Sequence, residues 1–430
     1  MKKILCLVLV LCLAISMTSV LADAVSGTYT YHIQGDDWGC GVDKAILTLS
    51  EAVEGLTAEN LTVTENKTTL DWGTFSIVPA AGPRNVVAVY ACDAEGNAVE
   101  GASQYWTVEL NIDPNEGSPL LYKFPYNVWC DPYTLTFETA EDAPELAIAA
   151  EPTAVTSSTD PFEFATYDAA DMNGNAITYN YALYTPAAET KTMVVWLHGQ
   201  GEGASGLEGY TDGTDARIPI LGAEVTALAG DDFQSMMGGA YVLAPQSPSV
   251  WMDGGSGDIE GLAYSIYTES LHDLITMVKE QTGVEMIIIA GCSNGGYMTM
   301  IMAINYGAEY TAYVPVCEAL KDEFITDEQI EALAKLPMFF IYSQDDGTVD
   351  PTLYEIPTLA RLQAANAENL HVFAPEHVFD TTGRFTNVKI WFQNELDGTY
   401  MGHWSWIYFF NNTAVCETSG ETVWSWMAEQ

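Results

Sequence analysis

A serine flanked by glycines is the strongest candidate for catalysis in this sequence. Residues 291–295 read Gly-Cys-Ser-Asn-Gly and follow the apolar run 286–290. A buried strand that enters Gly-x-Ser-x-Gly and continues into a helix makes a sharp turn that exposes the serine hydroxyl, and the turn is too tight for side chains at the glycines. The next segment, 296–304, is apolar nearly all round, as expected of a short buried helix. This context predicts that Ser293 is a nucleophile, although the five-residue pattern alone also fits an ordinary turn between core elements.

A nucleophilic serine on such a turn requires a base, which in this chain order lies near the end of the sequence. Three of the six histidines follow the serine: His371, His377 and His403. His371 lies inside a strand-like segment, where a structural role is the better interpretation. The last strand-like segment is 388–392, and only His403 follows it. We therefore predict His403 as the base, with the loop residue His377 as its rival.

The acid of the triad is expected after the strand between the serine and the histidine. The apolar segment 338–342 is followed by a loop that contains Asp345, Asp346 and Asp350. Asp346 fits an Asp-x-x-Val turn that closes this strand and is our predicted acid. Asp345 stays as the alternative, because it is only one residue away, and Asp350 reads as a turn aspartate before a proline. Taken alone, the loop would be interpreted as solvated or as a weak cation site.

A glycine-rich loop after another buried strand, 192–197, is predicted to supply an oxyanion hole. Backbone N–H groups in such a loop can point at a developing negative charge. The second donor is expected to be the N–H of Asn294, the residue after the nucleophile. The other residues predicted to bind the oxyanion or the substrate are Gly199, Gln200 and Gly201. Trp251, just before a second glycine-rich loop at 252–261, is predicted to line the pocket, although an ordinary packing role fits it equally well.

These segments together resemble the α/β-hydrolase superfamily, and more narrowly the secreted bacterial esterases near the polyhydroxybutyrate-depolymerase and feruloyl-esterase group. The resemblance covers roughly residues 162–430. It implies a mostly parallel sheet flanked by helices, and a carboxylesterase that forms an acyl-enzyme on Ser293 without a metal or a cofactor. The segments that carry it are 197–203, 242–246, 291–296, 346–349 and 402–406.

The chain is predicted to be multidomain. Residues 25–140 contain short strand-like segments at regular spacing without a helical period, which indicates an all-β sandwich. Some relatives in the resembling group carry an immunoglobulin-like domain ahead of the hydrolase, and this region is expected to be one. Residues 141–160 are rich in Ala, Glu, Pro, Ser and Thr and read as a linker, followed by an α/β-hydrolase catalytic domain over 161–430. For Trp38 and Trp72 in the sandwich, core packing is favoured over sugar binding.

Targeting and charge limit the partners of the chain. Residues 1–24 read as a signal peptide with a basic start and a short apolar run, cleaved after Ala22 or Ala24. The mature chain is therefore expected outside the cytoplasm, secreted, periplasmic or at the cell surface, with no membrane span. The formal net charge is −45, with only 14 Lys and Arg against 59 Asp and Glu. This balance disfavours nucleic acids and anionic membranes as partners. The expected partner is a small-molecule or polymer-linked ester, and the oligomeric state is left open.

Two other functions fit parts of the sequence. One is a serine peptidase similar to the prolyl oligopeptidase group, whose members guard their site with a β-propeller. The other is a non-catalytic surface-binding module in which the sandwich does the binding. An intact set of Ser293, Asp346 and His403 argues against the second. The sequence names neither the acyl group nor the alcohol of the substrate.

Overall fold

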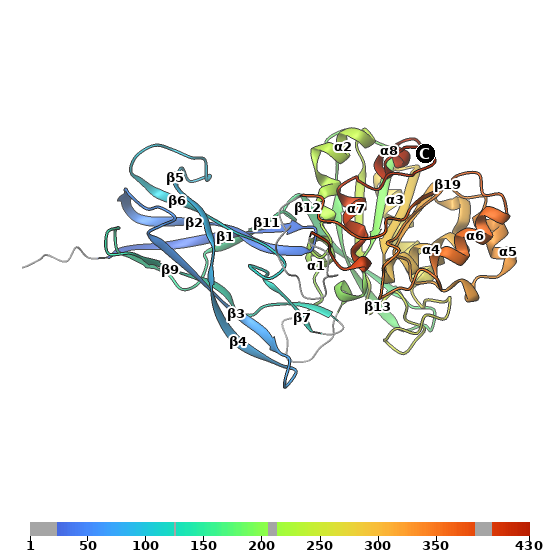
Figure 1. Ribbon diagram of the computed structural model, residues 1–430, viewed down its shortest axis with the longest axis horizontal. Coiled ribbons are helices and arrows are strands. Elements are labelled where there is room, and N and C mark those ends of the chain that lie inside the picture. The colour runs from blue at the N-terminus through green and yellow to red at the C-terminus, as the bar shows by residue number, and fades with distance from the viewer. Residues whose placement is uncertain (1–23, 124–125, 205–212, 383–397) are drawn as a thin grey trace, which may run out of the picture.

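The computed structural model describes residues 24–123, 126–204, 213–382 and 398–430. The predicted signal peptide lies outside the described residues except for Ala24, and so does the strand predicted over 388–392. The described residues form an all-β N-terminal domain followed by a domain of helices and strands, as Figure 1 shows. In this part of the chain, no helix is both long and apolar enough to cross a membrane.

The N-terminal domain is the predicted β-sandwich. Side chains alternate along the first strand, and its buried members, Tyr29, Tyr31 and Ile33, enter the domain core, as a half-buried strand requires. Tyr29 meets Phe137 of the facing sheet edge to face, with ring centroids 5.2 Å apart. The larger sheet has the order β10-β1-β2-β6-β5 with β11 also on β1, the smaller has the order β4-β3-β9, and β7 and β8 form a separate hairpin. The strands are β1 (Val25–Asp36), β2 (Gly39–Val53), β3 (Leu61–Asp71), β4 (Ser76–Arg84), β5 (Val86–Cys92), β6 (Ser103–Leu110), β7 (Leu120–Lys123), β8 (Tyr126–Trp129), β9 (Tyr133–Thr139), β10 (Leu146–Ile148) and β11 (Ala154–Ser157).

The segment 141–160 is not the free linker that its composition suggested. It contains β10 and β11, which both pair in parallel with β1. Strand pairing uses backbone N–H and C=O groups, so it does not require an apolar sequence. By pairing there, the two short strands cover the edge of β1 that would otherwise be open. The segment is thus part of the N-terminal domain.

The second domain is built on a twisted eight-stranded sheet of order β12-β13-β15-β14-β16-β17-β18-β19. The first two strands pair antiparallel and add to β15, and from β15 onward all neighbours are parallel. This is the predicted mostly parallel sheet. Its strands are β12 (Phe162–Ala170), β13 (Ala176–Tyr184), β14 (Thr192–Leu197), β15 (Tyr241–Gln246), β16 (Met286–Cys292), β17 (Ala312–Val316), β18 (Met338–Ile341) and β19 (Leu370–Phe373).

Helices cover both faces of this sheet, so its central strands are buried on both sides and read as unbroken apolar runs. Along β14, Met193 and Val195 enter one core cluster, whereas Val194 and Trp196 enter the other. The first cluster is covered by α3 (Thr268–Thr282), α4 (Asn294–Tyr306), α5 (Asp327–Leu333) and α6 (Glu355–Ala364). The second is covered by α1 (Arg217–Leu221), α2 (Asp231–Met237), α7 (Trp406–Phe410) and α8 (Val423–Ala428).

The two domains contact each other through side chains of both. The indole N–H of Trp129 on β8 donates a hydrogen bond of 2.9 Å to Oδ2 of Asp215, which lies just before α1. The guanidinium of Arg217 lies over the same indole, 5.2 Å from its centroid. Leu221, at the end of α1, is buried in the core cluster of the N-terminal domain. The seam is therefore packed rather than bridged by a flexible tether.

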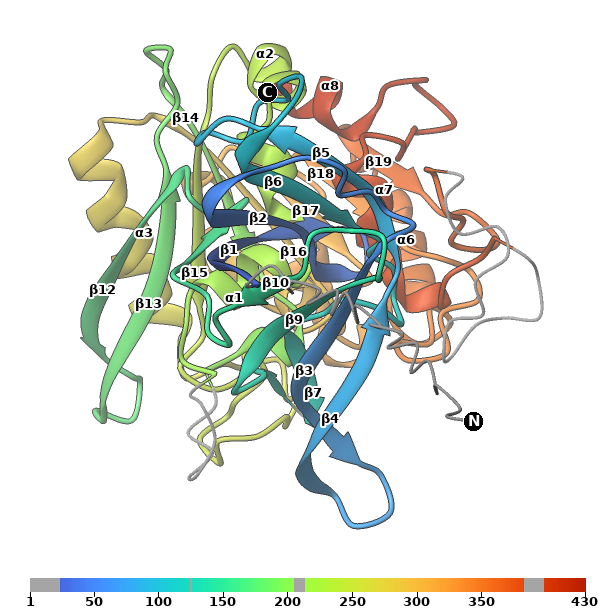
Figure 2. The ribbon, with the colours of Figure 1, turned by 90° about the vertical axis from the view of Figure 1, so that its left-hand side faces the viewer.

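The structure also shows where the described cysteines lie, and where the two tryptophans singled out in the sandwich sequence lie. All six described cysteines are buried and none is in a disulfide. Trp72 is 51% exposed and meets Phe75 edge to face at the tip of the β3–β4 hairpin, which projects from the body in Figure 2. The prediction of core packing is therefore wrong for Trp72, because that hairpin extends beyond the sandwich. Trp38 is partly buried against the core of the second domain.

Candidate active site

Ser293 lies on the turn between β16 and α4, as the sequence predicted. Its backbone has φ 56° and ψ −115°, a conformation that a non-glycine residue adopts only where its surroundings impose it. The Ser293 N–H donates to the carbonyl of Val316 on the neighbouring strand at 2.9 Å. Burial raises the pKa of the adjacent Cys292 thiol, which disfavours its reactive thiolate form.

The flanking glycines are required by close backbone contacts. A Cβ on Gly291 would lie 2.6 Å from the carbonyl oxygen of Gly295 and 2.7 Å from that of Leu197. A Cβ on Gly295 would overlap the Leu197 carbonyl, and one on Gly296 would lie 2.7 Å from the Val316 carbonyl oxygen. The start of α4 is thus pressed against the ends of two strands, and this packing holds the serine in its strained conformation.

His403 joins Ser293 to Asp346. Its Nε2 lies 2.9 Å from Ser293 Oγ, and its Nδ1 lies 2.7 Å from Asp346 Oδ2. His403 and Asp346 are 7% and 5% exposed, so little water competes for these hydrogen bonds. An ionised carboxylate can only accept, so Nδ1 carries the proton and Nε2 is left to accept from the serine hydroxyl. The structure thus brings together the three residues predicted as nucleophile, base and acid.

The turn after β18 sets the direction of the Asp346 carboxylate. Its Oδ1 accepts hydrogen bonds from the backbone N–H groups of Thr348 at 2.8 Å and Val349 at 2.9 Å. These two hydrogen bonds explain the Asp-x-x-Val pattern, because they close the turn onto the aspartate side chain. With Oδ1 held by two amides, Oδ2 is fixed toward His403.

The rival residues are placed elsewhere. Asp345 Oδ2 lies 2.8 Å from Nδ1 of His377, so the alternative acid and the alternative base pair with each other and not with the serine. Asp350 accepts from the N–H and the hydroxyl of Thr352, as a turn aspartate does. His371 on β19 lies 3.1 Å from Glu421 and stacks on Phe339, as expected of a structural histidine.

The loop after β14 carries a neutral histidine and a buried carboxyl group. His198 donates from Nδ1 to the Gly199 carbonyl at 2.6 Å, and its Nε2 accepts from the Ser247 N–H at 2.9 Å. Burial lowers the pKa of His198 to about 4, which leaves it neutral and structural. Burial also raises the pKa of Glu202 to about 7, although the N–H of Gly199 acts in the opposite direction by hydrogen bonding to the carboxylate.

The predicted oxyanion donors fall at the starts of two helices. Gln200 opens the short 3₁₀ helix η1 (Gln200–Glu202), and Asn294 opens α4. The first N–H groups of a helix have no partner within it, so the amides of Gln200, Gly201 and Asn294 are available to a ligand. The Gly199 amide faces the Glu202 carboxyl instead, which makes Gly199 the weaker donor candidate.

Trp251 does not line an open site. Its side chain is 0% exposed and stacks on Tyr179, with ring centroids 6.4 Å apart. The Trp251 backbone N–H donates to Asn294 Oδ1 at 2.6 Å. The residue therefore supports the first turn of α4 from beneath. Its position just before a glycine-rich loop suggested a wall of the site, but its ring is buried in the core.

The comparisons with known proteins agree with this architecture. Residues 28–160 match the family model of the esterase Ig-like N-terminal domain. A search of the curated proteins finds no match. Among solved structures, a thermostable esterase is similar over 91% of this chain and 97% of its own, with a TM-score of 0.64 and 17% identity.

The fold is that of an α/β-hydrolase preceded by an Ig-like domain. Two further structures are similar over about half of this chain. Brefeldin A esterase, described as a bacterial homologue of human hormone-sensitive lipase, has a TM-score of 0.35 at 13% identity and is covered over 71% of its chain. A ferulic acid esterase has a TM-score of 0.36 at 11% identity and is covered over 90%. Of these three structures, the thermostable esterase supports the fold of the whole chain.

The Ig-like domain reaches the loop after β14 that is predicted to supply the oxyanion hole, which the sequence did not reveal. A Cβ on Gly201 would lie 3.2 Å from Asn127 Nδ2 and 3.6 Å from the ring of Tyr122, both in the β7–β8 hairpin. Figure 1 shows this hairpin beside the second domain. No sequence signal could have located the contact, because it joins loops about 75 residues apart through tertiary packing alone.

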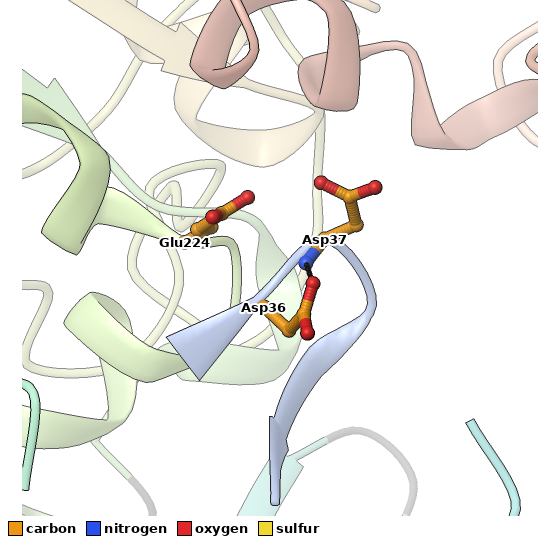
Figure 3. Close-up of side chains that lie close together, drawn as sticks. All are labelled: Asp36, Asp37 and Glu224. Carbon is orange, nitrogen blue, oxygen red and sulfur yellow. Dashed lines mark hydrogen bonds between the residues drawn. The ribbon is translucent and has the colours of Figure 1, made fainter. Parts of the chain in front are cut away.

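One acidic cluster lies at the domain seam. Figure 3 shows Asp36, the last residue of β1, and Asp37, in the turn before β2, near Glu224, which follows α1. One carboxylate oxygen of each lies within 4.8 Å of the others. The Asp37 carboxylate also accepts from Asn411 Nδ2 at 2.8 Å. Acidic groups gather in this way without a metal ion, and we assign none.

Proposed function

We propose that this α/β-hydrolase is a serine hydrolase that cleaves carboxylic esters through an acyl-enzyme on Ser293. The observation that carries the proposal is the buried chain of hydrogen bonds from Asp346 through His403 to Ser293, 2.7 and 2.9 Å long, on a serine held in a strained turn. The fold and the esterase description of the Ig-like domain family support it.

In the proposed mechanism each of the three residues has one role. Ser293 Oγ attacks the acyl carbon while Nε2 of His403 takes its proton, and the resulting imidazolium is stabilised by the Asp346 carboxylate. His403 then returns the proton to the departing alkoxide, which leaves as the alcohol. Water then hydrolyses the acyl-enzyme by the same steps. His403 takes a proton from water as the water oxygen attacks the acyl carbon, and the bond to Ser293 Oγ breaks as His403 returns the proton to that oxygen, which releases the carboxylic acid.

The negative charge that develops on the acyl oxygen requires donors. The amide of Asn294 and an amide of the Gln200–Gly201 turn are our proposed pair, because both belong to first turns of helices beside the serine. Removing one such donor from a serine hydrolase typically costs about 10²–10³ in kcat. These donors are backbone groups, so their contribution is tested through the residues that hold the loops.

Esters are proposed over peptides for two reasons. The domain ahead of the hydrolase is Ig-like, whereas peptidases of the prolyl oligopeptidase group screen their substrates with a β-propeller of several blades. An amine leaving group must also be protonated well in the transition state, which demands tighter placement of the leaving atom than an alcohol does. We further propose that the chain is exported, on the strength of residues 1–24.

A paired substrate series tests the ester proposal. The same acyl group is presented on an alcohol and on an amine or a proline-containing peptide, with Ser293→Ala as the blank. Acetyl, longer-chain and feruloyl esters define the acyl preference. We expect kcat/KM for esters to exceed that for matched amides by more than their intrinsic reactivity difference. Equal kcat/KM values for ester and matched amide, once corrected for their intrinsic reactivity, would favour the peptidase function.

A further inference from the structure

Asp345, one residue before the proposed triad acid, has a histidine of its own. Its Oδ2 lies 2.8 Å from Nδ1 of His377, and its Oδ1 accepts a 2.5 Å hydrogen bond from the hydroxyl of Ser343. Two consecutive carboxylates in one loop thus hold two different imidazoles. Asp346 holds His403, and Asp345 holds His377.

The main chain of Asp345 packs directly on the segment that carries His403. A Cβ on Gly402 would lie 2.6 Å from the carbonyl oxygen of Asp345 and 2.7 Å from its carbonyl carbon, so only glycine fits before His403. Close-packed contacts transmit displacement because no void absorbs it. A shift of Asp345 would therefore move Gly402 and, with it, the imidazole of His403.

The loop that contains His377 is attached to the same segment from another side. Tyr408, on α7 directly after His403, donates its hydroxyl to the His377 carbonyl at 2.9 Å and accepts from the Phe379 N–H at 2.8 Å. His377 is thus bonded through its main chain to α7, and through its side chain to Asp345 in the loop after β18. It links the two segments that supply the base and the acid.

We propose that His377 is a positioning residue for His403, acting through Asp345. This inference rests on the proposed function, since it assigns His403 the role of base. Nδ1–H of His377 fixes the Asp345 carboxylate, which keeps the Asp345 backbone against Gly402. Among the described residues, the charged groups that face the imidazole are Asp345, from the loop after β18, and Glu376, from its own loop, the latter 3.7 Å from Nε2. A neutral imidazole donates from Nδ1 as well as a charged one, so the role requires no change of ionisation.

Two substitutions separate the donor from the ring. His377→Asn keeps an N–H donor near the Nδ1 position, whereas His377→Phe keeps a ring and removes the donor. We expect kcat of His377→Phe on 4-nitrophenyl acetate to fall by about 10–100-fold with KM within about threefold, because misplacement of a catalytic group by 1 Å costs about 10²-fold. The rate of labelling by diisopropyl fluorophosphate should fall in parallel, and His377→Asn should stay within about threefold of the parent.

His371→Ala is the matched control. It removes another histidine that is paired with a carboxylate, at 3.1 Å from Glu421, and it should leave kcat within about threefold. If His377→Phe does not fold, as judged by circular dichroism, His377→Ala replaces it. The inference is overturned if the donor-free variant keeps kcat within threefold, or if His377→Asn loses as much as it does. A parent chain that neither hydrolyses the ester nor reacts with the fluorophosphate would instead overturn the proposed function.

Discussion

The substitution Asp346→Asn is expected to impose the wrong tautomer on His403 and leave the fold in place. Asp346 Oδ1 accepts from the backbone N–H groups of Thr348 and Val349. An asparagine must keep its amide oxygen on these two donors, because its NH₂ group cannot accept. The NH₂ then faces Nδ1 of His403, which has to act as the acceptor. The ring proton moves to Nε2, and the base can no longer take the proton of Ser293.

The size of this loss follows from the geometry. Loss of the correct tautomer in a serine hydrolase costs about 10⁴ in kcat, which corresponds to about 5.5 kcal/mol of transition-state stabilisation. The KM should change little, because the Asp346 carboxylate faces His403 and the backbone of its own loop. The assay compares kcat on 4-nitrophenyl acetate for Asp346→Asn, Asp345→Asn and Asp350→Asn, with the Ser293→Ala rate subtracted.

The two neighbouring aspartates are the controls. Asp345→Asn should lose no more than about tenfold, because an asparagine keeps an oxygen that can accept from His377, and its side chain affects His403 only through packing. Asp350→Asn should be silent, because its carboxylate holds only Thr352. A larger loss in Asp345→Asn than in Asp346→Asn would show that the acid is misassigned. Retention of kcat within tenfold by a folded Asp346→Asn would refute the tautomer argument.

Three further predictions concern stability and the domain seam. Gly295→Ala should destabilise the fold by about 3 kcal/mol or more, because the new Cβ overlaps the Leu197 carbonyl. Gly347→Ala should cost less than about 0.5 kcal/mol, because no atom lies within 4 Å of its new Cβ. Urea unfolding measures both free energies, and equal losses would contradict the steric explanation. Burial raises the pKa of Glu202 to about 7, above that of the unfolded chain, so Glu202 reduces stability progressively as the pH rises from about 5 to 7. Glu202→Gln should therefore gain about 2–3 kcal/mol relative to the parent between pH 5 and pH 8, and a gain that is equal at both values would contradict this. A chain that begins at residue 161 should keep some esterase activity but have a lower Tm. The truncation exposes Leu221 and removes the contact of the β7–β8 hairpin with the loop after β14. Complete inactivity of a folded truncated chain would mean that the Ig-like domain completes the site.

The sequence predicted the local structure around the three candidate residues, because that structure depends on short-range contacts. The strand before Ser293, the glycines around it and the Asp-x-x-Val turn each depend on contacts within a few residues or with the adjacent strands. Burial on both faces made the central strands continuous apolar runs, which are easy to recognise. The order of nucleophile, acid and base along the chain then separated His403 from His377.

The sequence failed where tertiary contacts decide the outcome. Residues 141–160 look like a linker by composition, yet they pair with β1, because backbone pairing does not depend on apolar side chains. Trp251 and Trp72 are both tryptophans in loop-like contexts, but one is buried and the other is exposed. The pairing of Asp345 with His377 joins residues 32 positions apart, and only the fold shows that each of the two aspartates has its own histidine.

The central claim, that Ser293 is an activated nucleophile, is tested most directly by covalent labelling. The folded protein is treated with a fluorophosphonate at neutral pH, digested, and analysed by peptide mass spectrometry. We predict a single phosphonyl adduct on the peptide that contains Ser293, and loss of this adduct in Ser293→Ala and His403→Ala. Absence of labelling in the parent chain, or an adduct on another residue that persists in Ser293→Ala, would contradict the account.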